Sequence, residues 1–333
     1  MADKIYAYSS SPHVKNVRTT KNIMIDVCIA LAPACIMGII YFGYMAAVLL
    51  AVSVASAVLS EFIYLLIVGK KPCEILKQFD FSSCVTGLLI GMVIGVQSPV
   101  YVPIFGSAFA IIVVKMLFGG TGKNLVNPAV TGRIFVFISF TAVLAGGWVE
   151  PSIGAILGGT SISPETGATI LTDSYQASAT TNLSALDLLL GTGLTGCIGE
   201  TCKLALLVGG VYLVVRKVIN GLYPLIYIAV TGLFTVCLNG FDFATFLPSI
   251  LTGGLILGAI FMATDYTTTP NTTLGNVIYF VMLGLLTAGL REATKMEVVS
   301  FAILLMNLTV PLIDKFVISK PFGFKKPEKV KEK

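Results

Sequence analysis

Residues 23–68 form one almost continuous apolar stretch, IMIDVCIALAPACIMGIIYFGYMAAVLLAVSVASAVLSEFIYLLIV. A helix needs about 20 apolar residues to cross a hydrocarbon layer ~30 Å thick, so this stretch is long enough for two transmembrane helices. Similar runs recur towards the C-terminus, and 56% of all residues are hydrophobic while 12% are charged. That composition is too apolar for an ordinary soluble domain. The sequence therefore predicts an all-α polytopic membrane protein.

The apolar runs predict about ten transmembrane helices. We place them at about residues 23–43, 45–68, 82–98, 101–118, 130–147, 197–215, 222–239, 245–263, 276–290 and 297–314. They divide the chain into a cytoplasmic N-terminal segment, a first transmembrane half, an extracytoplasmic loop, a second transmembrane half and a basic cytoplasmic tail. The bounds of these five regions are 1–22, 23–147, 148–196, 197–315 and 316–333.

Lys and Arg residues indicate the orientation of the chain, because they favour the cytoplasmic ends of transmembrane helices. They gather before the first predicted helix, after the second, around the connection that follows the fourth, after the sixth and in the tail. Residues 134–202 contain none. This pattern places both termini in the cytoplasm, with Arg291 and Lys295 as exceptions. It also accounts for the net charge of +5 without a nucleic-acid partner.

The seven cysteines show no CxxC spacing and lie mostly in apolar runs. We therefore expect neither a disulfide framework nor a metal site, and interpret them as small apolar side chains. The polar N-terminal segment does not have the pattern of a signal peptide.

Two irregular segments interrupt the apolar pattern at similar places in the two halves. FGGTGKNLVNPAVTGR, residues 118–133, follows the fourth predicted helix, and FMATDYTTTPNTTLGN, residues 261–276, follows the eighth. This echo favours an inverted-topology repeat, in which such Gly- and Pro-interrupted segments form the binding site. Irregular backbone survives at membrane depth only where protein or water covers it.

Asn124 and Asn127 are the chemically informative residues of the first segment. Two amides three residues apart can donate to and accept from the edge of a planar heterocycle such as an isoalloxazine. Asn127 also precedes Pro128, and asparagine before a first-turn proline is a common helix N-cap. Both interpretations remain open.

Two carboxylates lie near the ends of predicted helices, where a charge is costly unless it is paired or functional. Glu200 stands at the start of the sixth predicted helix and Asp265 at the end of the eighth. Each belongs either to a site or simply to a helix terminus.

Six motifs in order along the chain resemble one known family. They are SPHVKNVRTTKNIMIDVCIALAPA, FGGTGKNLVNPAVTGRIFVFISF, TGATIL, GCIGETCKLALLVGGVYL, FMATDYTTTPNTTLG and SFAILLMNLTVPLID. The family contains the D subunits of Rnf complexes, which are ferredoxin:NAD oxidoreductases, and the B subunits of the sodium-pumping NADH:quinone reductases. The resemblance implies a ten-helix, urea-transporter-like fold in the inner (cytoplasmic) membrane of a prokaryote.

The resemblance also implies FMN attached covalently, through a phosphoester, to the last threonine of a [S/T]-G-A-T motif. Here that motif is Thr166, Gly167, Ala168 and Thr169, so Thr169 would carry the flavin after the action of a flavin transferase. Thr180 in ASATT is a competing position that lacks the glycine.

A second, noncovalent flavin, riboflavin or FMN, is implied at the NxxNPA segment, which maps onto Asn124 and Asn127. The implied partners are the iron–sulfur and flavin subunits of the complex, the lipid bilayer, and Na+ or H+ as the transported ion. The chain has no dinucleotide-binding glycine fingerprint after a strand, so we expect no catalytic residue for hydride transfer.

We therefore expect a flavin-carrying membrane subunit of an ion-translocating ferredoxin:NAD oxidoreductase. The alternative is a small-solute channel or transporter of the same fold, because fold does not determine function. A purely structural membrane anchor is a third possibility, which the intramembrane polar segments disfavour.

Overall fold

The structure is a computed structural model that describes residues 18–145, 185–191 and 196–318. Every element within these ranges is helical, and they contain no β-strand. This confirms the predicted all-α class.

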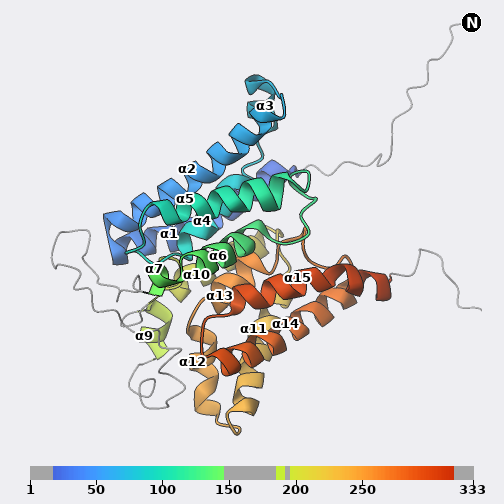
Figure 1. Cartoon of the computed structure of the whole chain (residues 1–333). Coiled ribbons are helices and arrows are strands. Elements are labelled where there is room, and N and C mark those ends of the chain that lie inside the picture. The colour runs from blue at the N-terminus through green and yellow to red at the C-terminus, as the bar shows by residue number, and fades with distance from the viewer. Residues whose placement is uncertain (1–17, 146–184, 192–195, 319–333) are drawn as a thin grey trace, which may run out of the picture.

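The helices of the first half follow the chain with short connections, apart from one extended segment between η1 and α6 (Figure 1). They are α1 (Thr20–Phe42), α2 (Tyr44–Ile67), α3 (Pro72–Gln78), α4 (Ser82–Met92), α5 (Tyr101–Phe109), η1 (Ala110–Met116), α6 (Pro128–Ser139) and α7 (Thr141–Ala145).

The helices of the second half lie below those of the first in Figure 1. They are α9 (Ala185–Leu190), α10 (Lys203–Val215), α11 (Leu222–Leu238), η4 (Phe243–Thr245), α12 (Phe246–Leu251), α13 (Leu255–Leu257), η5 (Gly258–Met262), α14 (Thr273–Thr294) and α15 (Val299–Phe316).

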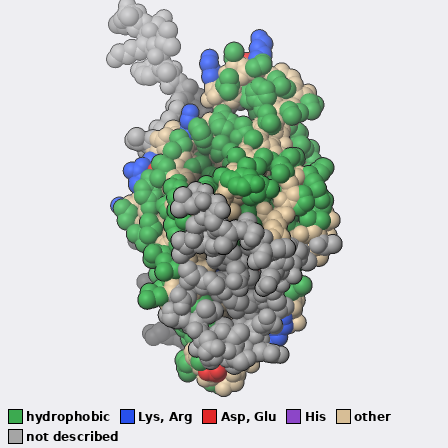
Figure 2. Space-filling model, turned by 90° about the vertical axis from the view of Figure 1, so that its left-hand side faces the viewer, with side chains coloured by type: hydrophobic (Ala, Val, Ile, Leu, Met, Phe, Trp, Pro, Cys, Tyr) green, Lys and Arg blue, Asp and Glu red, His purple; other side chains and the backbone are tan. Residues whose placement is uncertain are grey.

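The helices have the lengths and surfaces of a multi-pass membrane protein. Within the described ranges, α1, α2, α14 and α15 are each long and apolar enough to cross a membrane, and the bent pair that ends in η5 would make a fifth span. Five further apolar helices are shorter, with 10–17 residues. Hydrophobic side chains cover most of the described part of the face in Figure 2. The count of ten spans therefore stays a prediction.

Four of the predicted spans are shortened or interrupted in the structure, and one of them, predicted at 130–147, is broken between α6 and α7. The run predicted at 82–98 is helical only as far as Met92, and the run predicted at 197–215 becomes helical only at Lys203. The run predicted at 245–263 bends by 65° at its break. Glycine allows this last break, because Gly253 has a φ of +68°, in the left-handed region. Hydropathy alone does not reveal such breaks, because each run as a whole remains apolar.

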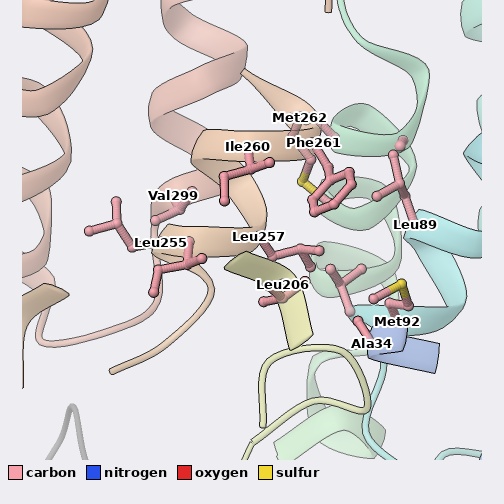
Figure 3. Packing of buried hydrophobic residues seen from close by; sticks show 14 of the residues in the cluster. Ala34, Leu89, Met92, Leu206, Leu255, Leu257, Ile260, Phe261, Met262 and Val299 are labelled. Carbon is pink, nitrogen blue, oxygen red and sulfur yellow. The ribbon is translucent and has the colours of Figure 1, made fainter. Parts of the chain in front are cut away.

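The two halves pack closely through α1 and α10. A Cβ added at Gly209 of α10 would overlap the carbonyl oxygen of Ala30 in α1. Small residues at a crossing let two membrane helices approach in this way. Around this contact lies the buried core, in which Ala34, Leu89 and Met92 of the first half meet Leu206, Leu257 and Phe261 of the second (Figure 3).

The echo between the two irregular segments also has a structural counterpart. η1 and η5 are both π-helices; η1 ends just before the first segment, and η5 includes the first two residues of the second. π-helical turns are rare and are frequently found at functional sites. The inverted-topology repeat stays a prediction.

Candidate functional site

The two irregular segments meet at one pocket, which we call the inter-half pocket. Apolar side chains of α1, α4, α10 and η5 form much of its wall. The first segment contributes Thr121, Asn124 and Asn127, and the second contributes Thr264, Asp265 and Thr267. Figure 3 shows part of the apolar wall, where Phe261 of η5 lies beside Leu89 of α4. A largely apolar pocket with a few polar groups is the usual form of a small-molecule or cofactor site.

Asn127 is the N-cap of α6, as the capping alternative predicts. Its side-chain oxygen accepts a hydrogen bond from the Ala129 backbone N–H at 2.9 Å. Its side-chain nitrogen donates to the carbonyl oxygen of Met262, the last residue of η5, at 3.0 Å. Both polar atoms of the amide therefore have partners within the protein. Asn127 lines the pocket, but its main observed role is to join α6 of the first half to η5 of the second.

Asn124 differs from Asn127 in its hydrogen bonding. Its side-chain oxygen is buried and has no hydrogen-bond partner among the described residues. A buried acceptor without a partner costs about 1–3 kcal/mol, so this oxygen is suited to accept from a ligand N–H. The imide edge of an isoalloxazine carries such a donor. The residues of the pocket therefore fit a flavin ring.

A charged cluster surrounds Lys115 of η1, which lines the pocket together with Ser82 of α4. The Lys115 side chain is 2% exposed, and its Nζ lies 2.8 Å from Glu61 Oε1 and 4.0 Å from Asp80 Oδ1. The same nitrogen donates to Ser82 Oγ at 2.7 Å and to Ser83 Oγ at 3.0 Å. Sequence patterning used Lys115 only as a sign of orientation and did not single out Glu61. The sequence signal for this cluster is that Glu61 and Lys115 each place a charge inside an apolar run.

Asp80 lies in the connection between α3 and α4, at the edge of this cluster. Burial raises the pKa of its carboxyl group, but the charge of Lys115 and hydrogen bonds from Ser82 and Thr121 outweigh burial and lower the pKa below its ordinary value. Asp80 is therefore ionised at neutral pH and fixes the start of α4.

Asp265 lines the inter-half pocket and also shapes the second segment. Its carboxylate accepts from the Thr267 backbone N–H at 3.3 Å and from Thr267 Oγ1 at 2.9 Å. η5 ends at Met262, so Asp265 lies beyond the helix end and bonds Thr267 in the segment that follows, and its role in a site stays a prediction.

Glu200 belongs to a separate buried cluster at the helix break between α12 and α13. Its Oε1 lies 3.4 Å from Arg133 Nη2, and nearby Glu297 Oε2 lies 2.9 Å from Arg291 Nη2. Cβ atoms added at Gly253 and Gly254 would contact Glu297 and Glu200 respectively, so the two carboxylates converge on the break. The carboxylate of Glu200 is thus paired.

The same contacts explain an exception to the charge pattern. Arg291 is 2% exposed and ion-paired, so its position reflects burial against Glu297 and not membrane orientation.

The predicted attachment turn, with Thr166, Gly167, Ala168 and Thr169, lies outside the described residues, as does Thr180. Covalent attachment of FMN therefore stays a prediction. Within the described ranges, no group of three or more His, Cys, Asp or Glu side chains is placed to hold a metal ion.

Comparisons with known proteins identify similar sequences along nearly the whole chain. The model of the NQR2, RnfD, RnfE family matches residues 7–323. The chain is 36% identical over 324 residues, 96% of each protein, to the D subunit of the Na(+)-translocating ferredoxin:NAD(+) oxidoreductase complex of Acetobacterium woodii. It is 34% identical over 328 residues, again 96% of each, to the D subunit of the proton-translocating ferredoxin:NAD(+) oxidoreductase complex of Clostridium ljungdahlii. It is 32% identical over 327 residues, 90% of this chain and 91% of the other, to the D subunit of the ion-translocating oxidoreductase complex of Stutzerimonas stutzeri.

Proposed function

The chain belongs to the NQR2, RnfD, RnfE family, and we propose that it is the D subunit of an ion-translocating ferredoxin:NAD oxidoreductase complex. The observation that carries this proposal is the 36% identity, over 96% of both chains, to a relative with that name. In this role the chain is a multi-pass membrane subunit that holds redox cofactors and couples electron transfer to ion transport. Its partners are the iron–sulfur and flavin subunits of the same complex.

A noncovalent flavin, riboflavin or FMN, occupies the inter-half pocket in this proposal. The buried, unpartnered oxygen of Asn124 accepts from the flavin ring, and the apolar side chains of α1 and η5 cover its faces. Asn127 holds the two sides of the pocket together through Met262. The bound flavin supplies the ability to take up and release electrons, while the protein binds it, orients it and limits access of water.

A second flavin, FMN, is joined to Thr169 in the extracytoplasmic loop. This part of the proposal rests on the TGAT motif at residues 166–169 and on family membership. The threonine hydroxyl loses its proton and its oxygen forms the ester bond to the flavin phosphate, the group that the flavin donor carries on that phosphate leaves, and a flavin transferase carries out this exchange.

The identity of the ion does not follow from similarity, because the two relatives quoted first are named for Na+ and for protons respectively. Ion transport by the purified complex in vesicles, with and without Na+ and with a protonophore, distinguishes the two.

Fluorescence of the chain in a denaturing gel tests the proposal, because only a covalently attached flavin survives unfolding. The wild-type chain gives a fluorescent band, and Thr169→Val removes it because valine has the same branched shape without the attacking oxygen. Thr180→Val is the matched control and leaves the band unchanged. A wild-type complex without covalent or extractable flavin would instead favour the small-solute channel or transporter.

A further inference from the structure

A chain of buried polar groups lies directly behind the wall of the inter-half pocket. It runs from Asn127 at the start of α6 to Asn307 of α15 and then to Tyr279 of α14. The side chains of Asn307 and Tyr279 are 1% and 0% exposed, so neither touches the pocket space or water. Buried polar groups at membrane depth are costly and are retained where they do specific work.

The neighbours of the Asn307 amide determine its orientation. With its oxygen towards α6, the amide accepts from the Asn127 backbone N–H at 3.2 Å, and its nitrogen donates to the Tyr279 hydroxyl at 2.7 Å and to the Ile303 carbonyl oxygen at 3.3 Å. In the opposite orientation the amide nitrogen would face the Asn127 N–H and the amide oxygen would face the Ile303 carbonyl, whereas the Tyr279 hydroxyl can donate or accept and suits either orientation. The Ile303 carbonyl and the Asn127 N–H therefore select the orientation, and the Tyr279 hydroxyl holds the other side of the amide at 2.7 Å.

Three helical elements are tied together at Asn127 by these bonds. Its side chain holds the Met262 carbonyl at the end of η5, and its backbone N–H is held by Asn307 of α15. The residues that follow it, Pro128 and Ala129, line the pocket opposite η5. The Asn307 amide therefore holds Asn127, and through Asn127 the bond that joins the start of α6 to the end of η5.

We propose that Asn307 and Tyr279 are positioning residues for the noncovalent flavin, and that they set its affinity by fixing the start of α6 against η5. The inference rests on the proposed function of the inter-half pocket. Neither residue contacts the flavin, and both act through Asn127. Without the Asn307 oxygen, the Asn127 N–H is left buried and unsatisfied, and the start of α6 shifts towards another acceptor.

The experiment strips the purified complex of extractable flavin, adds riboflavin back and measures its dissociation constant. We expect Asn307→Leu to weaken binding about tenfold, which corresponds to about 1.4 kcal/mol. Asn307→Asp keeps an oxygen towards Asn127 and restores part of the affinity. The covalent flavin band stays unchanged in both variants and serves as the measure of intact complex.

A matched pair of tyrosines separates positioning from general stability. Tyr227 is also 0% exposed, and its hydroxyl lies 2.8 Å from Thr287 Oγ1, away from the pocket. Tyr279→Phe should weaken riboflavin binding, whereas Tyr227→Phe should lower the melting temperature by a similar amount and leave binding unchanged. If Asn307→Leu does not fold, the comparison of Tyr279→Phe with Tyr227→Phe tests the positioning role alone.

Equal riboflavin affinity in Tyr279→Phe, Tyr227→Phe and wild type would overturn the proposal and leave Asn307 and Tyr279 as core residues. A wild-type complex that binds no riboflavin would instead overturn the proposed flavin site itself, and the positioning role with it. The two failures are therefore distinguishable.

Discussion

At the scale of single residues, the two asparagines of the NxxNPA segment have different tasks. The sequence presents them as equivalent amides, whereas the structure engages both polar atoms of Asn127 and gives the Asn124 oxygen no partner among the residues it describes. Sequence spacing could identify the pair, but it could not assign the roles. The partner of Asn127 is Met262, which lies 135 residues away along the chain.

Asn124→Leu and Asn127→Leu should therefore differ in their effects. Asn124→Leu removes only an unpartnered acceptor, so extractable flavin should fall while the melting temperature stays close to that of wild type. Asn127→Leu leaves the Ala129 N–H and the Met262 carbonyl without partners, each a loss of about 1–3 kcal/mol, so both flavin content and melting temperature should fall. Quantifying extractable flavin and thermal unfolding in parallel checks this. Unchanged extractable flavin in both variants would restrict these asparagines to structural roles.

At the scale of elements, the apolar runs predicted the positions of most helices but not their interruptions. Helices α1, α2, α11, α14 and α15 lie within a few residues of the predicted spans, because an apolar run of suitable length has few alternatives in a bilayer. The breaks near Val93 and Gly253 depend on tertiary contacts that a hydropathy window does not contain. The same limit applies to the candidate site, where both irregular segments were predicted and the Lys115 cluster was not.

The break between α12 and α13 can be tested with two glycines of similar backbone conformation. Gly253 and Gly240 have φ values of +68° and +72°, so alanine at either position costs about 1–2 kcal/mol of backbone strain. An alanine Cβ at Gly240 meets no neighbour, whereas at Gly253 it overlaps the carboxylate of Glu297 that pairs with buried Arg291. Gly253→Ala should therefore lower the free energy of unfolding more than Gly240→Ala does. Thermal or denaturant unfolding in detergent measures these losses. Equal losses of unfolding free energy in the two variants would mean that the ion pair between Arg291 and Glu297 rearranges around the added methyl group without further cost.

At the scale of the whole molecule, both halves contribute to the pocket, and the Lys and Arg pattern predicts one orientation with Lys295 as its remaining exception. The close contact at Ala30 and Gly209 holds α1 against α10, and the inter-half pocket lies between elements of both halves. Neither half alone could form that pocket. Arg291 is buried, so it no longer counts as an exception to the rule that Lys and Arg favour the cytoplasmic ends of transmembrane helices. The remaining exception, Lys295, is bonded to Glu292 at the end of α14.

This orientation predicts where two positions outside the described residues lie relative to the membrane. Five predicted spans separate Ser174 from Lys329, and an odd number of crossings places two positions on opposite sides. The absence of Lys and Arg from residues 134–202 assigns Ser174 to the outer face, and the basic tail assigns Lys329 to the cytoplasm.

Ser174→Cys should therefore react with a membrane-impermeant thiol reagent in intact cells, whereas Lys329→Cys should react only after permeabilisation. Exposed Cys73 and Cys237 must first be replaced, because they could react themselves. Reaction of both introduced cysteines from the same side would require an even number of crossings between them, and so one span more or fewer in the second half.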